Sequence, residues 1–315
     1  MPDALPARLN AATARLIGHP VAPGERFGIA VSGGADSMAL LAAAAVCWPG
    51  QVAAATVDHG LRPEGRAEAE MVGHWCAGHG VAHGILSAHV DPNGNLQAHA
   101  RAARYTLLAD WQAGQGLDWL MTAHQADDQI ETMILRLNRG AGVGGLASVR
   151  ARRGTLLRPL LGERRAALRA YCVAQRIPFV DDPSNVDDRF DRVRLRAALD
   201  GAPWIDPEGL NRSTEALAQA DAALAWATDG LAEDFLDLGD RTASLSRTDL
   251  PPEFLRRLLL RMIAYVHPEA EKPRGPSLDQ ALVQLYCAKT VSLADCVVTG
   301  GATWTVRRAP PRKAR

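Results

Sequence analysis

Residues Phe27–Ser37, with the sequence FGIAVSGGADS, carry the strongest indication of the fold. Their apolar half, Phe27–Val31, predicts a short buried strand, and the apolar run Met38–Trp48 after it predicts a helix that Pro49 closes. Between the two lies the turn Ser32-Gly33-Gly34-Ala35-Asp36-Ser37. A glycine-rich turn from strand to helix lets backbone N–H groups approach phosphate oxygens at the positive end of the helix. The stretch therefore predicts a phosphate-binding loop.

The polar side chains of this loop indicate what it binds. Ser32 and Ser37 add hydroxyl donors for phosphate, whereas Asp36 would repel a phosphate unless a Mg²⁺ ion lay between them. The Walker pattern is absent, because no Gly-Lys-Ser or Gly-Lys-Thr follows the glycines. A purely structural turn is the alternative, and the flanking serines and aspartate favour the functional interpretation. We expect a phosphate group and Mg²⁺ at this loop, with Asp36 as the metal ligand.

The rest of the first part of the chain alternates between strands and helices. Strands are expected at Val52–Val57, around Ile85-Leu86 and at Trp119–Ala123, and helices at Arg66–His79, Gln97–Gln112 and Ala126–Asn138. This alternation predicts an α/β, Rossmann-like fold with a doubly wound parallel sheet. Polar motifs directly follow three of the strands: Ser32–Ser37, Asp58-His59 and His124–Asp128. Because ligands bind beyond the carboxyl ends of such strands, we expect the three motifs to line one crevice.

The second part of the chain has a different pattern. From Glu208 onward the periodicity is helical, over Glu208–Leu238, Pro252–His267 and Ser277–Lys289. We place the domain boundary near residue 200, around Gly201-Ala202-Pro203. The prediction is a catalytic domain over residues 1–200 and a smaller, mainly helical C-terminal domain over residues 201–315.

The formal net charge of the chain is zero, from 35 basic and 35 acidic residues. This balance would argue against a nucleic-acid partner if it were uniform, but the charges are segregated. Residues 136–196 hold fourteen arginines and six acidic residues, and residues 197–240 hold one arginine and ten acidic residues. The arginine-rich segment follows the motifs of the predicted crevice, where a nucleic-acid backbone would need to lie. We expect salt-sensitive binding of a nucleic acid.

The sequence shows no sign of export or of membrane insertion. Its longest apolar run, Met38–Trp48, is eleven residues long, whereas a membrane span needs about 20. No secretory apolar segment follows the N-terminus. The five cysteines are far apart and form no Cys-x-x-Cys, which disfavours a zinc site and a redox pair. We therefore expect a cytoplasmic protein with reduced thiols and no membrane partner.

The loop Ser-Gly-Gly-x-Asp-Ser and the expected fold together resemble the N-type ATP pyrophosphatases, or PP-loop superfamily. These enzymes split ATP between its α- and β-phosphates and adenylate a substrate oxygen. Further motifs, within residues 25–200, resemble the tRNA(Ile)-lysidine synthetase family: Asp58-His59-Gly60-Leu61-Arg62, Arg101-Ala102-Ala103-Arg104-Tyr105, Thr122–Thr132, Gly140–Leu146, Arg158–Leu161, Asp182–Asn185 and Arg192–Arg196.

Two residues depart from the motifs of that family. Gln125 stands where the family has a second histidine after His124, and Val193 stands where it has an asparagine. Gln125 keeps a hydrogen-bonding side chain but cannot transfer a proton, so we assign no proton transfer to it. Val193 lacks the amide that could contact a ligand, and we leave it out of the site.

The resemblance implies roles for particular residues. ATP is expected to contact Ser32, Gly33, Gly34, Ala35, Asp36, Ser37, Asp58, His59, Arg104 and His124. Asp128 and Glu131 are three apart on one helix face, and the resemblance implies that they seat L-lysine and form the catalytic set with Asp36. The residues expected to contact tRNA are Arg192, Arg194 and Arg196.

The implied reaction has two steps on an isoleucine tRNA with a CAU anticodon. The O2 oxygen of the wobble cytidine attacks the α-phosphate of ATP, and pyrophosphate leaves into the loop. The ε-amine of L-lysine then attacks C2, which expels AMP, forms lysidine and changes decoding from AUG to AUA. A carboxylate is the candidate base for the amine. The C-terminal domain is expected to help hold tRNA, and a homodimer is left open.

Two other functions stay open at this point. A tRNA 2-thiolation enzyme of the same superfamily would also adenylate a pyrimidine and would then transfer sulfur. Such enzymes usually need paired cysteines or an iron–sulfur cluster, and this chain has no Cys-x-x-Cys. A non-catalytic ATP-binding or tRNA-binding module is the second alternative, and the carboxylates Asp36, Asp128 and Glu131 argue against it.

Overall fold

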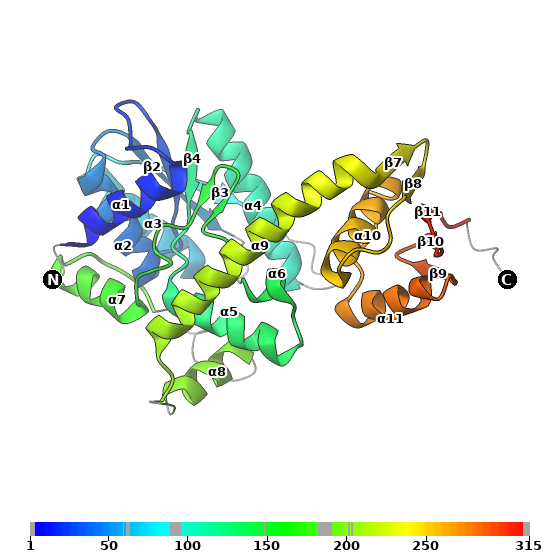
Figure 1. The fold of residues 1–315 in the computed structure, drawn as a ribbon. Helices are drawn as coiled ribbons and strands as arrows, with labels where there is room; N and C mark the ends of the chain where they lie inside the picture. Colours follow the sequence, from blue (N-terminus) through cyan, green and yellow to red (C-terminus); the bar gives the residue numbers. More distant parts are fainter. Residues whose placement is uncertain are drawn as a thin grey trace. The chain divides into compact units, whose positions relative to one another are not determined.

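The computed structural model describes residues 4–310, except 59, 61–63, 89–95, 148, 182–190, 201 and 203. The chain divides into two compact units (Figure 1). The first unit comprises Met1–Leu135 and Ser148–Thr214, and the second comprises Arg136–Ala147 and Glu215–Arg315. These units differ from the predicted segments 1–200 and 201–315, because Arg136–Ala147 groups with the second unit and the first unit continues to Thr214.

A six-stranded sheet forms the centre of the first unit. Its strand order is β3-β2-β1-β4-β6-β5, and all neighbours pair in parallel except the edge strand β5, which is antiparallel to β6. The strands are β1 (Phe27–Ala30), β2 (Val52–Asp58), β3 (Ala82–Ser87), β4 (Trp119–Met121), β5 (Arg152–Arg153) and β6 (Leu156–Leu157). The order of strands reverses between β1 and β4, which makes the carboxyl ends of these two strands the expected ligand site.

Helices cover both faces of this sheet. On one face, the core includes side chains of α1 (Leu5–Ile17), α2 (Ala35–Cys47), α3 (Glu64–Gly78) and α7 (Arg165–Ala174). On the other face, α4 (Leu96–Gly114) contributes Leu108 and Trp111. Neighbouring residues of β2 belong to different cores, Ala54 to the first and Ala55 to the second, because successive strand residues point to opposite faces. The predicted doubly wound α/β sheet is confirmed.

The predicted elements of this unit agree closely with the observed ones. Helix α5 (Ala126–Asn138) has the predicted bounds, and α2 begins three residues earlier than predicted, directly after Gly34. Helix α8 (Asp191–Asp200) is the last complete helix of the unit. Helix α1 was not predicted, although Leu5, Leu9, Thr13 and Ile17 are buried at the four-residue spacing of a helix face.

The second unit contains helices and a separate antiparallel sheet. The strand order of the sheet is β7-β8-β11-β10-β9. The elements are α6 (Val143–Leu146), β7 (Leu236–Gly239), β8 (Thr242–Leu245), α10 (Pro252–Val266), α11 (Gly275–Tyr286), β9 (Thr290–Leu293), β10 (Cys296–Thr299) and β11 (Trp304–Arg308), with α9 (Pro207–Phe235) entering from the first unit. Its core centres on Trp304 and on leucines of α10 and α11.

The five strands of the second unit were not predicted from the sequence. Between β9 and β10 the turn residues Ala294 and Asp295 both have positive φ, 51° and 54°. Two such residues match the tight hairpin turn that usually carries Asn-Gly or Asp-Gly, and that signature is missing here. The hairpin is therefore specified by the alternating burial of Cys296 and Val298, which is too short a pattern to stand out from the helical context.

No helix in the described part of the chain has the length and apolar character that crossing a membrane would require.

Close packing between β1 and α4 generates a test of the first unit. A Cβ atom at Gly28 would lie 2.6 Å from Trp111 Cζ3 and 2.9 Å from Leu117 Cδ1. We expect Gly28→Ala to lower the free energy of unfolding by about 1–3 kcal/mol, the usual cost of overpacking, as measured by urea denaturation. Gly78→Ala is the control, because no atom lies within 4 Å of its added Cβ. Equal stability of the two variants would contradict this account of the packing.

Candidate active site

The glycine-rich loop lies between β1 and α2, at the carboxyl end of β1. Gly33 has a φ of +85°, which side chains disfavour, and Gly34 is the N-cap residue of α2. The N–H of Met38 donates to Gly34 O at 3.0 Å and begins the helical hydrogen bonds. The earlier N–H groups, of Ala35, Asp36 and Ser37, therefore have no acceptor within the helix. They lie at its N-terminus, the end of a helix that attracts anions.

Internal hydrogen bonds hold the loop in shape. Ser37 is buried, and its Oγ donates to Gly34 O at 2.9 Å and accepts the N–H of Ser32 at 3.1 Å. Val180 N donates to Gly33 O at 3.0 Å, which joins the loop to the segment after α7. The hydroxyl of Ser37 is thus used to brace the loop, and a direct bond from it to phosphate would require it to leave Gly34 O.

Asp36 is the second residue of α2 and is mostly buried, with 27% of its side chain exposed. Burial raises the pKa of its carboxyl to about 6, although Arg165 and the hydrogen-bonding side chain of Gln125 act in the opposite direction. The Nε of Arg165 lies 4.0 Å from Asp36 Oδ2, and Asp36 Oδ1 is buried without a hydrogen-bond partner among the described residues. This carboxylate is incompletely solvated by the protein and has capacity for a further positive ligand.

Helix α5 follows β4 and begins with a reciprocal cap made by Gln125 and Asp128. The Oε1 of Gln125 accepts the N–H of Asp127 at 2.5 Å and that of Asp128 at 3.3 Å, and Asp128 Oδ2 accepts the N–H of Gln125 at 3.2 Å. This is the geometry of a capping box, with glutamine in the role that serine or threonine usually has. Gln125 therefore departs from the family motif in identity, and its side chain caps the start of α5.

Asp127 ties the start of α5 to the start of α7. Its carboxylate accepts three hydrogen bonds from Arg164, the shortest at 2.7 Å, and its Oδ2 accepts the N–H of Arg165 at 2.8 Å. Burial alone would raise the pKa of Asp127, but these bonds outweigh burial and lower it. Asp127 is an ionised structural link between two helices, so Asp128 and Glu131 remain the carboxylates with a predicted role in chemistry.

The guanidinium of Arg165 brings the three predicted catalytic residues together. Its Nη2 lies 3.4 Å from Asp128 Oδ1 and 3.2 Å from Glu131 Oε1, and its Nε lies 4.0 Å from Asp36 Oδ2. Glu131 also accepts from Arg196, whose Nε lies 2.5 Å from Oε1. Only 1% of the Glu131 side chain is exposed, so this buried charge is compensated by two arginines.

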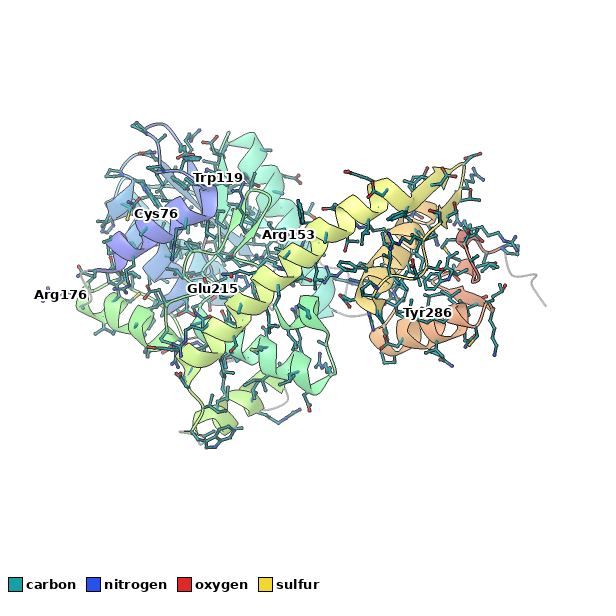
Figure 2. All side chains as sticks on the ribbon, in the orientation of Figure 1. Cys76, Trp119, Arg153, Arg176, Glu215 and Tyr286 are labelled. Carbon is teal, nitrogen blue, oxygen red and sulfur yellow. The ribbon has the colours of Figure 1, made fainter. Side chains whose placement is uncertain are left out.

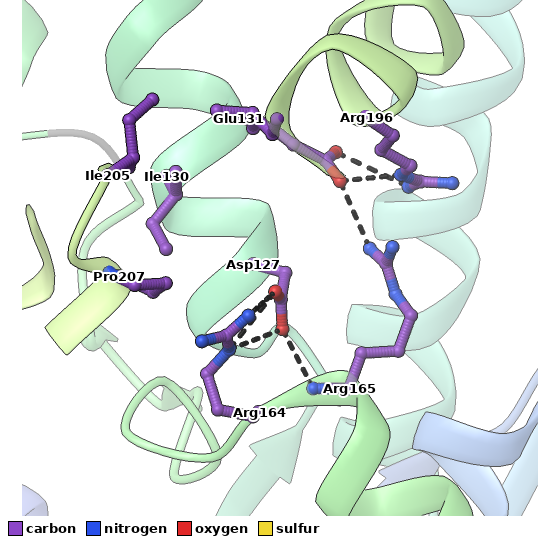
Figure 3. Close-up of a pocket in the computed structure, with 9 residues that line it drawn as sticks. Asp127, Ile130, Glu131, Arg164, Arg165, Arg196, Ile205 and Pro207 are labelled. Atoms are coloured by element: carbon purple, nitrogen blue, oxygen red, sulfur yellow. Dashed lines mark hydrogen bonds and ion pairs between the residues drawn. The ribbon is translucent and has the colours of Figure 1, made fainter. Parts of the chain in front are cut away.

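A pocket of about 160 Å³ lies beside this cluster (Figure 3). Its charged wall consists of Asp127, Glu131 and the arginines that pair with them, and its apolar wall comes from α5, α8, the segment between α8 and α9, and the first residue of α9. The apolar residues are Ile130, Leu199, Ile205 and Pro207. The dashed contacts in Figure 3 show Arg164 on Asp127 and both Arg165 and Arg196 on Glu131.

The remaining predicted ATP contacts lie at other strand ends or on α4. Asp58 ends β2, and its Oδ1 accepts the N–H of Gly60 at 2.9 Å. His124 follows β4, with Nδ1 at 2.9 Å from Thr122 Oγ1. Arg104 of α4 lies over the ring of Tyr105, with 5.4 Å between Cζ and the ring centroid, and burial lowers its pKa. His59 lies outside the described residues.

The three arginines predicted to contact tRNA are placed differently from one another. Arg196 is partly buried and bonds to Glu131, whereas Arg194 is exposed. The side chain of Arg192, the departure at Val193 and the motif Asp182–Asn185 lie outside what the structure describes. Contact of these arginines with tRNA stays a prediction.

Arg164 and Arg165 are residues of the candidate site that the sequence does not single out. They belong to an arginine-rich segment, in which sequence alone does not distinguish an arginine that pairs internally from one that meets solvent. Their place in the sequence could have indicated them, because both follow the motif Arg158–Leu161, which comes directly after β6. Their partners lie more than 30 residues away on another helix, and only the fold brings them together.

Mg²⁺ at Asp36 can be tested against the residues present. The buried and unpartnered Oδ1 of Asp36 fits a metal ligand. In the described part of the chain, no group of three or more histidines, cysteines or acidic residues is arranged to hold a metal ion. Such an ion would therefore need further oxygen ligands from nucleotide phosphates and water, as Mg²⁺ commonly has.

The raised pKa of Asp36 predicts a pH-dependent cost to stability. Because the pKa in the folded protein is about 6 against an ordinary 3.8, the folded state binds the proton more tightly than the unfolded state. Stability therefore falls as the pH rises from about 4 to about 6, by about 3 kcal/mol in total. We expect Asp36→Asn to be more stable than the wild type at pH 8 and equal to it near pH 4, in urea denaturation without ligands. An exposed control, Asp249→Asn, should not change with pH in this way. A wild type more stable than Asp36→Asn at pH 8 would show that the ionised carboxylate of Asp36 does not destabilise the fold.

Comparison with known proteins identifies the family of the chain. Residues 7–201 match the family model of the PP-loop domain. The tRNA(Ile)-lysidine synthase of Zymomonas mobilis is 41% identical, over 91% of this chain and 90% of its own length. That of Novosphingobium aromaticivorans is 42% identical, over 92% of this chain and 91% of its own length.

A solved structure shares the fold at low sequence identity. It is a U34-tRNA thiolase from Methanococcus maripaludis with a [4Fe-4S] cluster, with a TM-score of 0.56 and 14% identity over 68% of this chain and 79% of that chain. At this identity the likeness concerns the fold alone. The PP-loop domain and the identities with curated relatives over most of both chains show that this chain belongs to the tRNA(Ile)-lysidine synthase family.

Proposed function

We propose that this chain is an ATP-dependent ligase that forms a carbon–nitrogen bond between L-lysine and the wobble cytidine of isoleucine tRNA with a CAU anticodon. The cytidine O2 attacks the α-phosphate of ATP, and pyrophosphate leaves. The ε-amine of lysine then attacks C2 and displaces AMP, which leaves lysidine and changes decoding from AUG to AUA. We assign the protein to the cytoplasm, and a homodimer stays a prediction.

The observation that carries this proposal is the shared guanidinium of Arg165. It lies within 4.0 Å of Asp36, at the end of the phosphate-binding loop, and of Asp128 and Glu131 on α5. The carboxylate expected at the nucleotide, Asp36, therefore belongs to the same cluster as Asp128 and Glu131, the carboxylates expected to bind an amine. A reaction that first activates an oxygen with ATP and then admits an amine needs these two sites to be adjacent.

The loop is suited to hold the leaving pyrophosphate. N–H groups of Ala35, Asp36 and Ser37 at the start of α2 present donors to phosphate oxygens, and the positive φ of Gly33 lets the backbone turn toward them. Asp36 would hold Mg²⁺ through its unpartnered Oδ1. A bound Mg²⁺ neutralises charge on the departing phosphate groups.

Asp128 and Glu131 differ in what they can do for lysine. Asp128 is 21% exposed and Glu131 is 1% exposed, so Asp128 is the more accessible to the ε-ammonium. Glu131 is held in place by Arg165 and Arg196, which compensate its charge. Before attack the ammonium must lose a proton, and a carboxylate of this pair is the candidate base.

The cysteines disfavour the alternative of sulfur transfer. Burial raises the pKa of Cys47 and Cys76 to about 11 and that of Cys172 to about 12, so these three remain thiols at neutral pH. Cys172 also donates through Sγ to Ala35 O at 3.3 Å, beneath the loop. A thiolation enzyme would need a reactive thiolate or a metal cluster near the adenylated base, and these residues favour neither.

The tRNA backbone would meet exposed arginines of the first unit. Arg153, Arg176 and Arg194 are exposed, and Figure 2 labels the first two. Several other arginines of the same segment pair with carboxylates of α5 that lie outside the segment, namely Arg164, Arg165 and Arg196. The charge offered to tRNA is therefore smaller than the sequence count of +8 suggests. A tRNA-holding role for the C-terminal part stays a prediction.

Incorporation of lysine into tRNA tests the proposed function. With ATP, Mg²⁺ and isoleucine tRNA, we expect labelled lysine, and not labelled sulfur, to appear in one nucleoside at the wobble position. Asp36→Ala should abolish pyrophosphate release while tRNA binding survives, because only the metal ligand is lost. Sulfur incorporation would identify a thiolase, and tRNA binding without pyrophosphate release by the wild type would identify a binding module. Loss of tRNA binding in Asp36→Ala would show that Asp36 is structural.

The dependence of tRNA affinity on salt tests the role of the exposed arginines. Because binding phosphates releases counterions, we expect the Kd for tRNA to rise about tenfold or more between about 50 and 200 mM salt. The double variant Arg153→Gln, Arg176→Gln should reduce the slope of log Kd against log salt. Arg247→Gln, in the second unit and paired with Asp249, provides the control. An affinity that does not change with salt would exclude electrostatic docking of the tRNA backbone.

A further inference from the structure

Three carboxylates from two separate helices meet at one cation. Asp36 comes from α2, and Asp128 and Glu131 come from α5, and Asp36 and Asp128 are 92 positions apart in the sequence. Like charges this close repel one another unless a cation lies between them. The guanidinium of Arg165 supplies that cation, and among the described residues no other side chain is recorded within 4.0 Å of all three.

The backbone of Arg165 is fixed independently of these contacts. Its N–H donates to Asp127 Oδ2 at 2.8 Å, at the first residue of α7. The neighbouring Arg164 binds the same carboxylate through Nε and Nη2. Further along α7, Cys172 bonds to Ala35 O beneath the phosphate-binding loop. The side chain of Arg165 therefore extends from a helix start that is tied both to α5 and to α2.

The contacts of Arg165 are unequal. Its Nη2 approaches Glu131 and Asp128 at 3.2 and 3.4 Å, whereas its closest approach to Asp36 is 4.0 Å. Glu131 is also held by Arg196, so loss of Arg165 would leave Glu131 one arginine partner among the residues that the structure describes. The consequence of losing Arg165 should therefore be larger for the lysine-binding carboxylates of α5 than for Asp36.

We propose that Arg165 is a positioning residue that holds Asp128 and Glu131 in the arrangement that receives the ammonium of lysine, and aligns them with Asp36. The inference rests on the proposed function, because it assigns lysine to these carboxylates. Arg165 does not react with substrate. It sets the separation of the carboxylates, which determines how well an ammonium group fits between them.

Steady-state kinetics of Arg165 variants test this inference. We expect Arg165→Ala to raise the KM for lysine about tenfold or more, with the KM for ATP changed by no more than about threefold. Arg165→Lys, which keeps the charge and loses the planar fork, should recover part of the lysine KM. Arg165→Gln, which keeps an amide donor without the charge, should recover less. The matched control is Arg169→Ala, which removes an exposed pair with Asp181 from the same helix.

The outcomes separate this inference from the proposed function. If the wild type incorporates no lysine, the proposed function fails before any variant is compared. If the wild type is active and Arg165→Ala retains its lysine KM, the positioning role is wrong. A fall in kcat with both KM values unchanged and no recovery in Arg165→Lys would show a purely structural role. If circular dichroism shows that Arg165→Ala does not fold, Arg165→Lys is compared with Arg169→Ala instead. A raised KM for lysine in Arg165→Lys alone would support the positioning role, and an unchanged KM for lysine would contradict it.

Discussion

The constraint on which the site depends is the repulsion between carboxylates gathered in a partly buried space. Arg165 compensates Asp36, Asp128 and Glu131, and Arg196 adds a second cation for Glu131, the most buried of the three. The charge compensation joins four helices, because the arginines come from α7 and α8 and the acids come from α2 and α5. The pairing of these four helix segments explains why the site is assembled from residues between 36 and 196.

The protein does not compensate all three carboxylates equally. Asp36 keeps a raised pKa and an unpartnered oxygen, whereas Asp127, nearby on α5, is fully bonded and has a lowered pKa. The contrast separates a carboxylate available to a metal from one that links two helices. Burying the ionised carboxylate of Asp36 lowers the stability of the fold but keeps a negative charge available to a ligand. Such an exchange of stability for ligand binding is expected at a functional site.

Many arginines of this chain pair with carboxylates of the protein itself, and only the remaining arginines can attract tRNA. The net charge is zero, and the arginine-rich segment suggests a continuous basic surface. In the structure, Arg164, Arg165 and Arg196 are bound to carboxylates of α5. Electrostatic attraction of tRNA therefore depends on the remaining exposed arginines, and the count over a sequence segment overestimates it.

The alternation of strands and helices, the phosphate-binding loop and the carboxylates of α5 could be predicted from the sequence, because they depend on local periodicity and on short motifs. The sequence also identified Gln125 as a departure but not its capping role, which depends on the backbone of α5. Three features became visible in the tertiary structure alone. Arg165 contacts all three carboxylates, and Arg196 points inward to Glu131. The second unit contains an antiparallel sheet. Pairings between residues distant in the sequence carry no local signal, since the free energy that selects them comes from burial and charge compensation in the folded chain.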